Sequence, residues 1–150
     1  MNDATRAQLG LGPMDQLGFV FKDLEAAVKA YEPIYGPFKI INYGSYDYNY
    51  RGQQEACELR MAFARSGDLE IEFIQWVSGG SPHKEFLDAG REGMHHVRFR
   101  VESLESKVAE AEKLGYRAIW QTRFAEGLAV AYMERDCDPV LVELFENLQE

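Results

Sequence analysis

Apolar and polar residues alternate in several short runs, and two of these runs begin similar stretches of the chain. Residues 15–21 alternate in type, which predicts a strand with one apolar face, and residues 95–101 do the same 80 positions later. Each run leads into apolar residues at helical spacing, over 23–35 and 103–114. A repeat of this length predicts two copies of one structural unit.

Each copy continues with further strand-like stretches, so each reads strand, helix, strand, strand, strand. We expect a first module at 14–77 and a second at 94–146, within a single domain over 14–150. A linker helix over 81–89 joins them, because Ser81 is a good N-cap and Pro82 suits the first helical turn. The further expected strands are 38–50, 59–64 and 69–76 in the first module and 116–122, 128–134 and 140–146 in the second.

The first 13 residues are polar and contain glycine, without the apolar stretch of a secretory signal. We expect them to form a flexible arm, or one that packs on a partner subunit. No apolar run approaches the roughly 20 residues that a membrane-spanning helix needs, so we expect no membrane partner. Hydrophobic residues make up 46% of the chain, which is enough for an ordinary core.

The formal net charge of −9 argues against nucleic acid as a partner, since binding to phosphate backbones depends on clustered Lys and Arg. Only Cys57 and Cys137 are present, and no export signal precedes them. Free thiols and a cytoplasmic location are therefore expected.

Four polar residues stand at equivalent places in the two modules. Gln16 and His96 lie near the start of each copy, and Glu72 and Glu143 lie in its last strand. In each strand the apolar neighbours should pack under a helix, so all four side chains point to the face that no helix covers. If the sheets curve toward each other, the four converge. An imidazole, an amide oxygen and two carboxylates suit a divalent metal, and the lack of a thiolate argues against a structural zinc finger.

Other residues on this face are candidates for substrate binding. Arg98 is a natural clamp for a carboxylate or phosphate group, or it pairs with an acidic neighbour such as Glu70. Tyr48, Trp76 and Phe145 either line an apolar substrate pocket or simply pack in the sheet.

The remaining histidines have less specific interpretations. His95 alternates to the face opposite His96, where a supporting or structural role is expected. His83 falls on the linker helix, where we expect a solvated surface residue. Gln16 binds metal less firmly than an imidazole does, and the alternative is a hydrogen-bonding group in a metal-free cavity.

The stretch from Ile71 to Trp76, Ser81-Pro82 and the run Gly93-Met94-His95-His96-Val97 look like methylmalonyl-CoA epimerases. More broadly, residues 14–146 resemble the vicinal oxygen chelate superfamily, which includes glyoxalase I, extradiol dioxygenases and bleomycin-resistance proteins. This resemblance implies an α+β fold. Two βαβββ modules would form a cupped mixed sheet around a central cavity, with the helices on the outer face.

The resemblance also bears on the metal ligands. A first strand in the superfamily often reads Asp-His-Val-Gly, whereas here it reads Asp15-Gln16-Leu17-Gly18. Epimerases usually carry His at the position of Gln16, while the eukaryotic zinc glyoxalases carry Gln. Extradiol dioxygenases need two histidines and one carboxylate for iron, so Gln16 favours a glyoxalase-like site.

The activity implied by the resemblance is that of a metal-dependent lyase, isomerase or epimerase. It would act on a small carbonyl or thioester substrate through a metal-stabilised enolate, with Zn, Ni, Co or Mn as the ion and Glu143 or Glu72 moving the proton. A homodimer is expected. The alternatives are a metal-free protein that sequesters a small drug-like molecule and an extradiol-type dioxygenase.

Overall fold

A computed structural model describes residues 3–149 of the chain. Its strands are β1 (Met14–Val20), β2 (Lys39–Tyr50), β3 (Gln53–Ser66), β4 (Leu69–Ser78), β5 (Gly93–Val101), β6 (Arg117–Ala125), β7 (Leu128–Glu134) and β8 (Leu141–Asn147). Its helices are α1 (Asp3–Leu9), α2 (Leu24–Tyr35), α3 (Pro82–Asp88) and α4 (Leu104–Glu112). None of these helices is long and apolar enough to cross a membrane.

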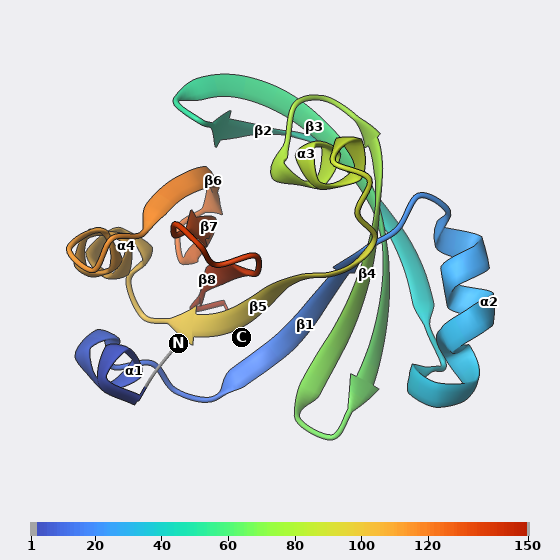
Figure 1. The fold of residues 1–150 in the computed structure, drawn as a ribbon, viewed down its shortest axis with the longest axis horizontal. Coiled ribbons are helices and arrows are strands. Elements are labelled where there is room, and N and C mark those ends of the chain that lie inside the picture. The colour runs from blue at the N-terminus through green and yellow to red at the C-terminus, as the bar shows by residue number, and fades with distance from the viewer. Residues whose placement is uncertain (1–2, 150) are drawn as a thin grey trace.

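The strands form one mixed sheet that closes on itself in the order β1-β4-β3-β2-β6-β7-β8-β5. Within each half the first and last strands are parallel, as in the pairs β1–β4 and β5–β8, and the other neighbours are antiparallel. The halves join where β1 meets β5 and where β2 meets β6. The two βαβββ modules and the mixed sheet around a central cavity are thus confirmed (Figure 1).

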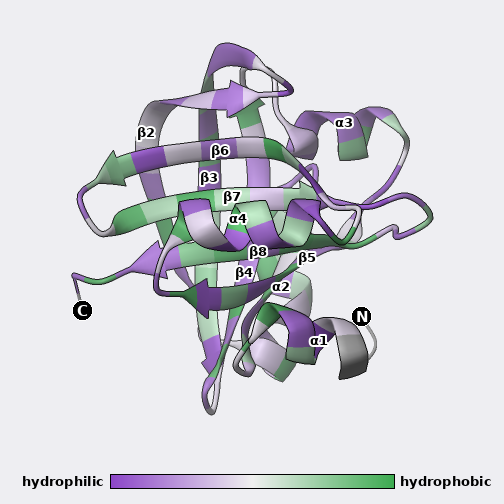
Figure 2. Cartoon of the chain, turned by 90° about the vertical axis from the view of Figure 1, so that its left-hand side faces the viewer, coloured by the Kyte–Doolittle hydropathy of each residue, from purple (hydrophilic) through white to green (hydrophobic). Residues whose placement is uncertain are grey.

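Helices cover the sheet from outside, as expected. In Figure 1, α2 lies against the first module and α4 against the second, and Figure 2 shows α4 lying over β7 and β8. Under α2, Leu24 packs with Ile71 and Phe73. Under α4, Leu104 packs with Val142 and Leu144. In β4 and β8, the apolar residues that alternate with Glu72 and Glu143 therefore pack under a helix, and the other face of these strands is turned to the interior.

The helix ends follow local signals. The side chains of Asp23, Ser81 and Ser103 each accept a hydrogen bond from a backbone N–H in the first turn of α2, α3 and α4. Helix α2 agrees with the helix expected over 23–35, and it continues through Pro33 to Tyr35. The last turn of a helix can lose one N–H donor when packing holds it in place.

The N-terminal segment differs from the expected flexible arm. Residues 3–9 form α1, and Leu9 and Leu11 are buried against the core beneath α4. The Lys107 ammonium donates to the carbonyl oxygen of Leu9, which ties the segment to α4. The arm packs because these two leucines cover apolar surface that α4 alone leaves open.

Candidate metal centre

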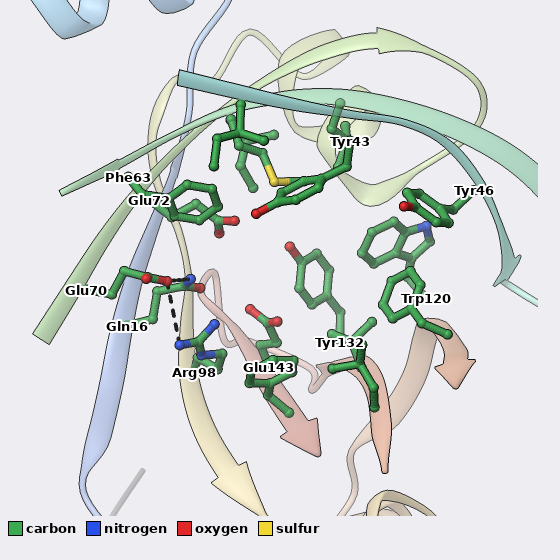
Figure 3. A pocket seen from close by; sticks show the side chains of 18 of the residues that line it. Gln16, Tyr43, Tyr46, Phe63, Glu70, Glu72, Arg98, Trp120, Tyr132 and Glu143 are labelled. Atoms are coloured by element: carbon green, nitrogen blue, oxygen red, sulfur yellow. Dashed lines mark hydrogen bonds and ion pairs between the residues drawn. The ribbon is translucent and has the colours of Figure 1, made fainter. Parts of the chain in front are cut away.

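Four neighbouring strands, β4, β1, β5 and β8, bring the four predicted polar residues into the barrel. Gln16, Glu72, His96 and Glu143 are all buried, and their side chains share the interior face (Figure 3 labels Gln16, Glu72 and Glu143). Gly18 pairs with Glu72 on one side and with His96 on the other. Strand alternation therefore places the residues as the sequence predicts.

Gly18 is needed for this arrangement, because the imidazole of His96 lies directly over it. A Cβ atom added at Gly18 would come within 2.0 Å of the Cε1 atom of His96. Any side chain at this position would push the ring away from the two carboxylates. The Gly in the first strand is thus a packing requirement of the site.

Three oxygen atoms surround one nitrogen atom at the centre of the cluster. His96 Nε2 lies 3.0 Å from a carboxylate oxygen of Glu143, 3.3 Å from one of Glu72 and 3.1 Å from the amide oxygen of Gln16. One N–H proton cannot serve three acceptors well. The ligand atoms of Glu72, His96 and Glu143 lie within 4.8 Å of one another, so this buried group could hold a metal ion.

The charges in the cluster shift the pKa values of its members. Burial opposes a charge on His96, but the carboxylates of Glu143 and Glu72 outweigh it and raise the pKa of the imidazole to about 9. Burial raises the pKa of the Glu72 carboxyl above its usual range, and His96 opposes that rise. Without another cation, a proton on His96 balances the carboxylates.

His95 fixes which nitrogen of His96 faces the cluster. The Nδ1 atoms of the two rings are 3.1 Å apart, and the other side of His95 bonds to the backbone of Pro82. A proton between the two Nδ1 atoms leaves Nε2 of His96 directed at the cluster. Burial lowers the pKa of His95 well below its usual range, so His95 stays neutral. The supporting role expected for His95 matches these contacts.

Gln16 and Arg98 are held by acidic neighbours. The amide nitrogen of Gln16 donates to Glu70 over 2.7 Å, which turns its oxygen toward His96. Arg98 donates to both carboxylate oxygens of Asp15, at 2.9 and 3.2 Å, and lies 3.6 Å from Glu70. Burial would raise the pKa of Asp15, but Arg98 and Arg100 lower it. The expected pairing of Arg98 with acidic neighbours is present, mainly through Asp15.

The cluster opens into a cavity of about 760 Å³. Tyr48, Phe145 and Arg98 line it, as do Gln16, Glu72 and Glu143. The guanidinium of Arg98 lies 4.5 Å above the ring of Phe145. Trp76 was also expected at the substrate, but it lies outside the cavity lining, where its indole N–H donates to the carbonyl of Gly79.

Further aromatic residues of the cavity were not predicted from the sequence. Trp120 stacks on Tyr48 with ring centroids 3.9 Å apart. Tyr132 is buried, lines the cavity and pairs with Glu143 in the β7–β8 register. Alternation along residues 128–134 could have assigned Tyr132 to the interior face.

His83 was expected on the surface, and this expectation is wrong. Its side chain is fully buried, with Nε2 at 3.0 Å from the Tyr132 hydroxyl and Nδ1 at 3.3 Å from the Ser81 hydroxyl. Burial lowers the pKa of His83 to about 3. Helix α3 presses this residue against β5 and β7, and its sequence alone does not reveal that contact.

With the geometry established, comparison with known proteins places the chain in a family. A family model described as the Glyoxalase/Bleomycin resistance protein/Dioxygenase superfamily matches residues 15–132. The chain belongs to this superfamily. The match covers three of the four cluster residues, and Glu143 joins them through the pairing of β8 with β5.

Solved structures of similar fold agree with a glyoxalase-superfamily barrel. A hypothetical protein from Bacillus halodurans is 25% identical, with a TM-score of 0.64, over 92% of this chain and 96% of that one. The methylmalonyl-CoA epimerase of Mycobacterium tuberculosis is 19% identical, with a TM-score of 0.62, over 91% and 89%.

A further solved structure and one curated relative extend the comparison. A variant of the Streptomyces coelicolor methylmalonyl-CoA epimerase, in complex with 2-nitronate-propionyl-CoA, is 21% identical, with a TM-score of 0.62, over 93% of this chain and 96% of that one. The uncharacterized protein YqjC of Bacillus subtilis is 27% identical over 95 residues, which are 61% of this chain and 68% of that protein. At these identities the epimerases support the shared fold.

Proposed function

We propose that this glyoxalase-superfamily chain is a metal-dependent lyase, isomerase or epimerase that acts on a small carbonyl or thioester substrate through an enolate. The observation that carries the proposal is the crowding of three oxygen atoms around Nε2 of His96, at 3.0 to 3.3 Å. Atoms bound about 2.1 Å from one ion are roughly 3.0 to 3.4 Å apart, so these separations match a shared cation.

The chemistry of the donors also fits a divalent ion. Gln16, Glu72, His96 and Glu143 would hold it, through two carboxylates, an amide oxygen and an imidazole. These oxygen and nitrogen ligands suit Zn, Ni, Co or Mn better than a soft ion such as Cu(I), which prefers thiolates. When bound there, the ion supplies positive charge beside a substrate oxygen on which negative charge develops.

The protein's own residues would handle the proton. Glu72 and Glu143 come from different modules, and both carboxyl groups project into the cavity (Figure 3). A carboxylate oxygen of Glu143 would take the proton from the carbon next to the carbonyl, and Glu72 would deliver or accept the second proton. The buried surroundings keep bulk water away from the anion.

The cavity walls would bind the rest of the substrate. Tyr48 and Phe145 offer flat apolar surfaces, and Arg98 adds positive charge next to Phe145. The epimerase of Streptomyces coelicolor, which shares the fold, was solved with a CoA thioester analogue. That ligand supports thioesters as one class for testing, alongside hemithioacetals.

Proton exchange at carbon tests the proposal. Metal-loaded protein in D2O is expected to exchange the hydrogen next to the carbonyl of one member of a panel of acyl thioesters and hemithioacetals, followed by NMR. Glu143→Gln should slow that exchange by about 10²-fold or more, while the control Glu110→Gln, on the exposed face of α4, should exchange normally. Wild-type rates in the Glu143→Gln protein would rule out its role as the base.

A metal-free binding protein is the second candidate, and the aromatic cavity of about 760 Å³ favours it as a container for a small drug-like molecule. Tight binding of an aromatic compound by protein that neither holds nor needs a metal ion would support this reading over the enzyme. An extradiol-type dioxygenase is less well supported, because the cluster offers one imidazole where that chemistry uses two.

The assembly and location of the chain also remain proposals. We propose a homodimer in the cytoplasm with a small-molecule substrate as the main partner. The acidic net charge of −9 is consistent with no role for nucleic acid. Light scattering during gel filtration tests the dimer, for which a mass near twice 17.2 kDa is expected.

A further inference from the structure

Tyr132 borders the candidate metal centre and has no part in the proposal above. It pairs with Glu143 in the β7–β8 register, and its ring lies 4.9 Å from the ring of His96. In Figure 3 its hydroxyl projects into the cavity, toward the space between Glu72 and Glu143. A substrate oxygen held beside the cluster would therefore meet this hydroxyl.

The buried side chain of His83 forms a hydrogen bond with this hydroxyl. His83 Nε2 is 3.0 Å from the Tyr132 oxygen, and His83 Nδ1 is 3.3 Å from the hydroxyl oxygen of Ser81. Ser81 caps α3, so its oxygen already accepts the backbone N–H of Lys84. The thiol of Cys57 also forms a hydrogen bond with Ser81. When that thiol donates to the Ser81 oxygen, the proton of the Ser81 hydroxyl goes to Nδ1 of His83.

The tautomer of His83 that accepts from Ser81 at Nδ1 sets the direction of the whole chain of hydrogen bonds. Because burial keeps His83 neutral, its ring carries a single proton, and acceptance at Nδ1 places that proton on Nε2. Nε2 then donates to the Tyr132 oxygen. The hydroxyl proton of Tyr132 is left to point into the cavity, and within residues 3–149 the structure describes no other hydrogen bond of this hydroxyl.

We infer that Tyr132 is a further catalytic residue, which donates a hydrogen bond to the substrate oxygen on which negative charge develops. His83 is its positioning residue and holds the phenol oxygen from behind. The inference rests on the proposed function, since it needs a substrate oxygen beside the four candidate ligands. A preset donor aimed at a developing anion, away from bulk water, is an effective way to stabilise that anion.

The test uses Co²⁺ as the metal and acetohydroxamate as the probe, because acetohydroxamate is a small anion with two oxygen atoms. Calorimetric titration first measures Co²⁺ binding and then acetohydroxamate binding to the loaded protein. Tyr132→Phe should bind Co²⁺ as the wild type does but acetohydroxamate about 10-fold or more weakly, since a hydrogen bond to a charged acceptor is lost. Tyr116→Phe makes the same chemical change in a buried tyrosine of the core under α4, and should alter neither titration.

A double-mutant comparison tests the role of His83. His83→Leu should weaken acetohydroxamate binding about as much as Tyr132→Phe, and the double variant should bind no more weakly than Tyr132→Phe alone. His83→Gln keeps an N–H donor and should retain most of the affinity. Losses that add in the double variant would mean that His83 acts independently of Tyr132, which overturns its positioning role.

The outcomes separate the two proposals. If the wild type binds no Co²⁺, the proposed function fails and this inference fails with it. If the wild type binds both Co²⁺ and acetohydroxamate, and Tyr132→Phe binds the probe equally well, only the role of Tyr132 is overturned. Circular dichroism verifies that each variant folds. If His83→Leu does not fold, Tyr132→Phe and His83→Gln test the roles of Tyr132 and His83.

Discussion

At the scale of single residues, the site depends on Gly18 as much as on the four polar residues of the cluster. Gly18 leaves the space in which the His96 ring lies, and the ring in turn meets Glu72 and Glu143. Sequence reasoning identified the four polar residues because strand alternation fixes which face each one occupies. It gave Gly18 no role, since the need for that space appears only when β5 is seen paired with β1.

Replacing Gly18 should therefore damage the cluster without touching a ligand. Gly18→Ala places a methyl group 2.0 Å from Cε1 of His96, so the ring must move away from the carboxylates. We expect Co²⁺ affinity to fall by at least 10-fold, measured by calorimetric titration. Gly12→Ala is the matched control, because a Cβ there meets nothing within 4 Å. Equal Co²⁺ affinity in both variants would contradict the role given to Gly18.

A second residue-scale prediction concerns acid stability. His83 has a pKa of about 3 in the folded protein against about 6.5 in an unfolded chain, so the unfolded state binds the extra proton. The resulting stability is present above pH 6.5 and declines as pH falls toward 3. Each pH unit within that window costs about 1.4 kcal/mol for one such group.

Urea unfolding of metal-free protein between pH 6.5 and 5 measures this effect. The wild type should lose more stability than His83→Gln over the same interval, by roughly 1 to 2 kcal/mol. If the two proteins respond identically to pH, His83 is not held neutral by burial.

At the scale of elements, α1 is the clearest departure from what the sequence suggests. The first 13 residues look polar, yet Leu9 and Leu11 reach the core beneath α4. Two leucines in a polar stretch are too few to predict a helix that packs on the core. The surface they cover is created only when α4 lies on β6, β7 and β8.

Truncating Leu9 should show how much α1 contributes. Leu9→Ala is expected to lower the free energy of unfolding by about 2 kcal/mol or more, because a buried leucine leaves a cavity. Ile34→Ala, at a residue 71% exposed on α2, should change it by less than about 0.5 kcal/mol. Urea denaturation measures both. A Leu9→Ala protein as stable as Ile34→Ala would show that α1 does not dock in solution.

At the scale of the whole molecule, closure of the sheet converts two repeated modules into one site. The repeat predicted both modules, the order of helix and strands along each one, and the faces of their polar residues. It did not predict that α3 would press His83 against Tyr132, because that contact joins the linker to the second module. It also misplaced Trp76, since alternation says nothing about where a strand leaves the cavity. Local sequence patterns thus predict which face of a strand a residue occupies. The closing of the sheet determines which residues on that face come into contact.

We propose that the buried cluster of Gln16, Glu72, His96 and Glu143 binds one divalent ion. Elemental analysis of dialysed protein after loading with Zn²⁺ or Co²⁺ tests it most directly. We expect one ion per chain in the wild type, little in His96→Ala or Glu72→Gln, and the wild-type content in Glu110→Gln. Wild-type protein that retains no ion after loading, or that retains as much as its His96→Ala variant, would contradict it.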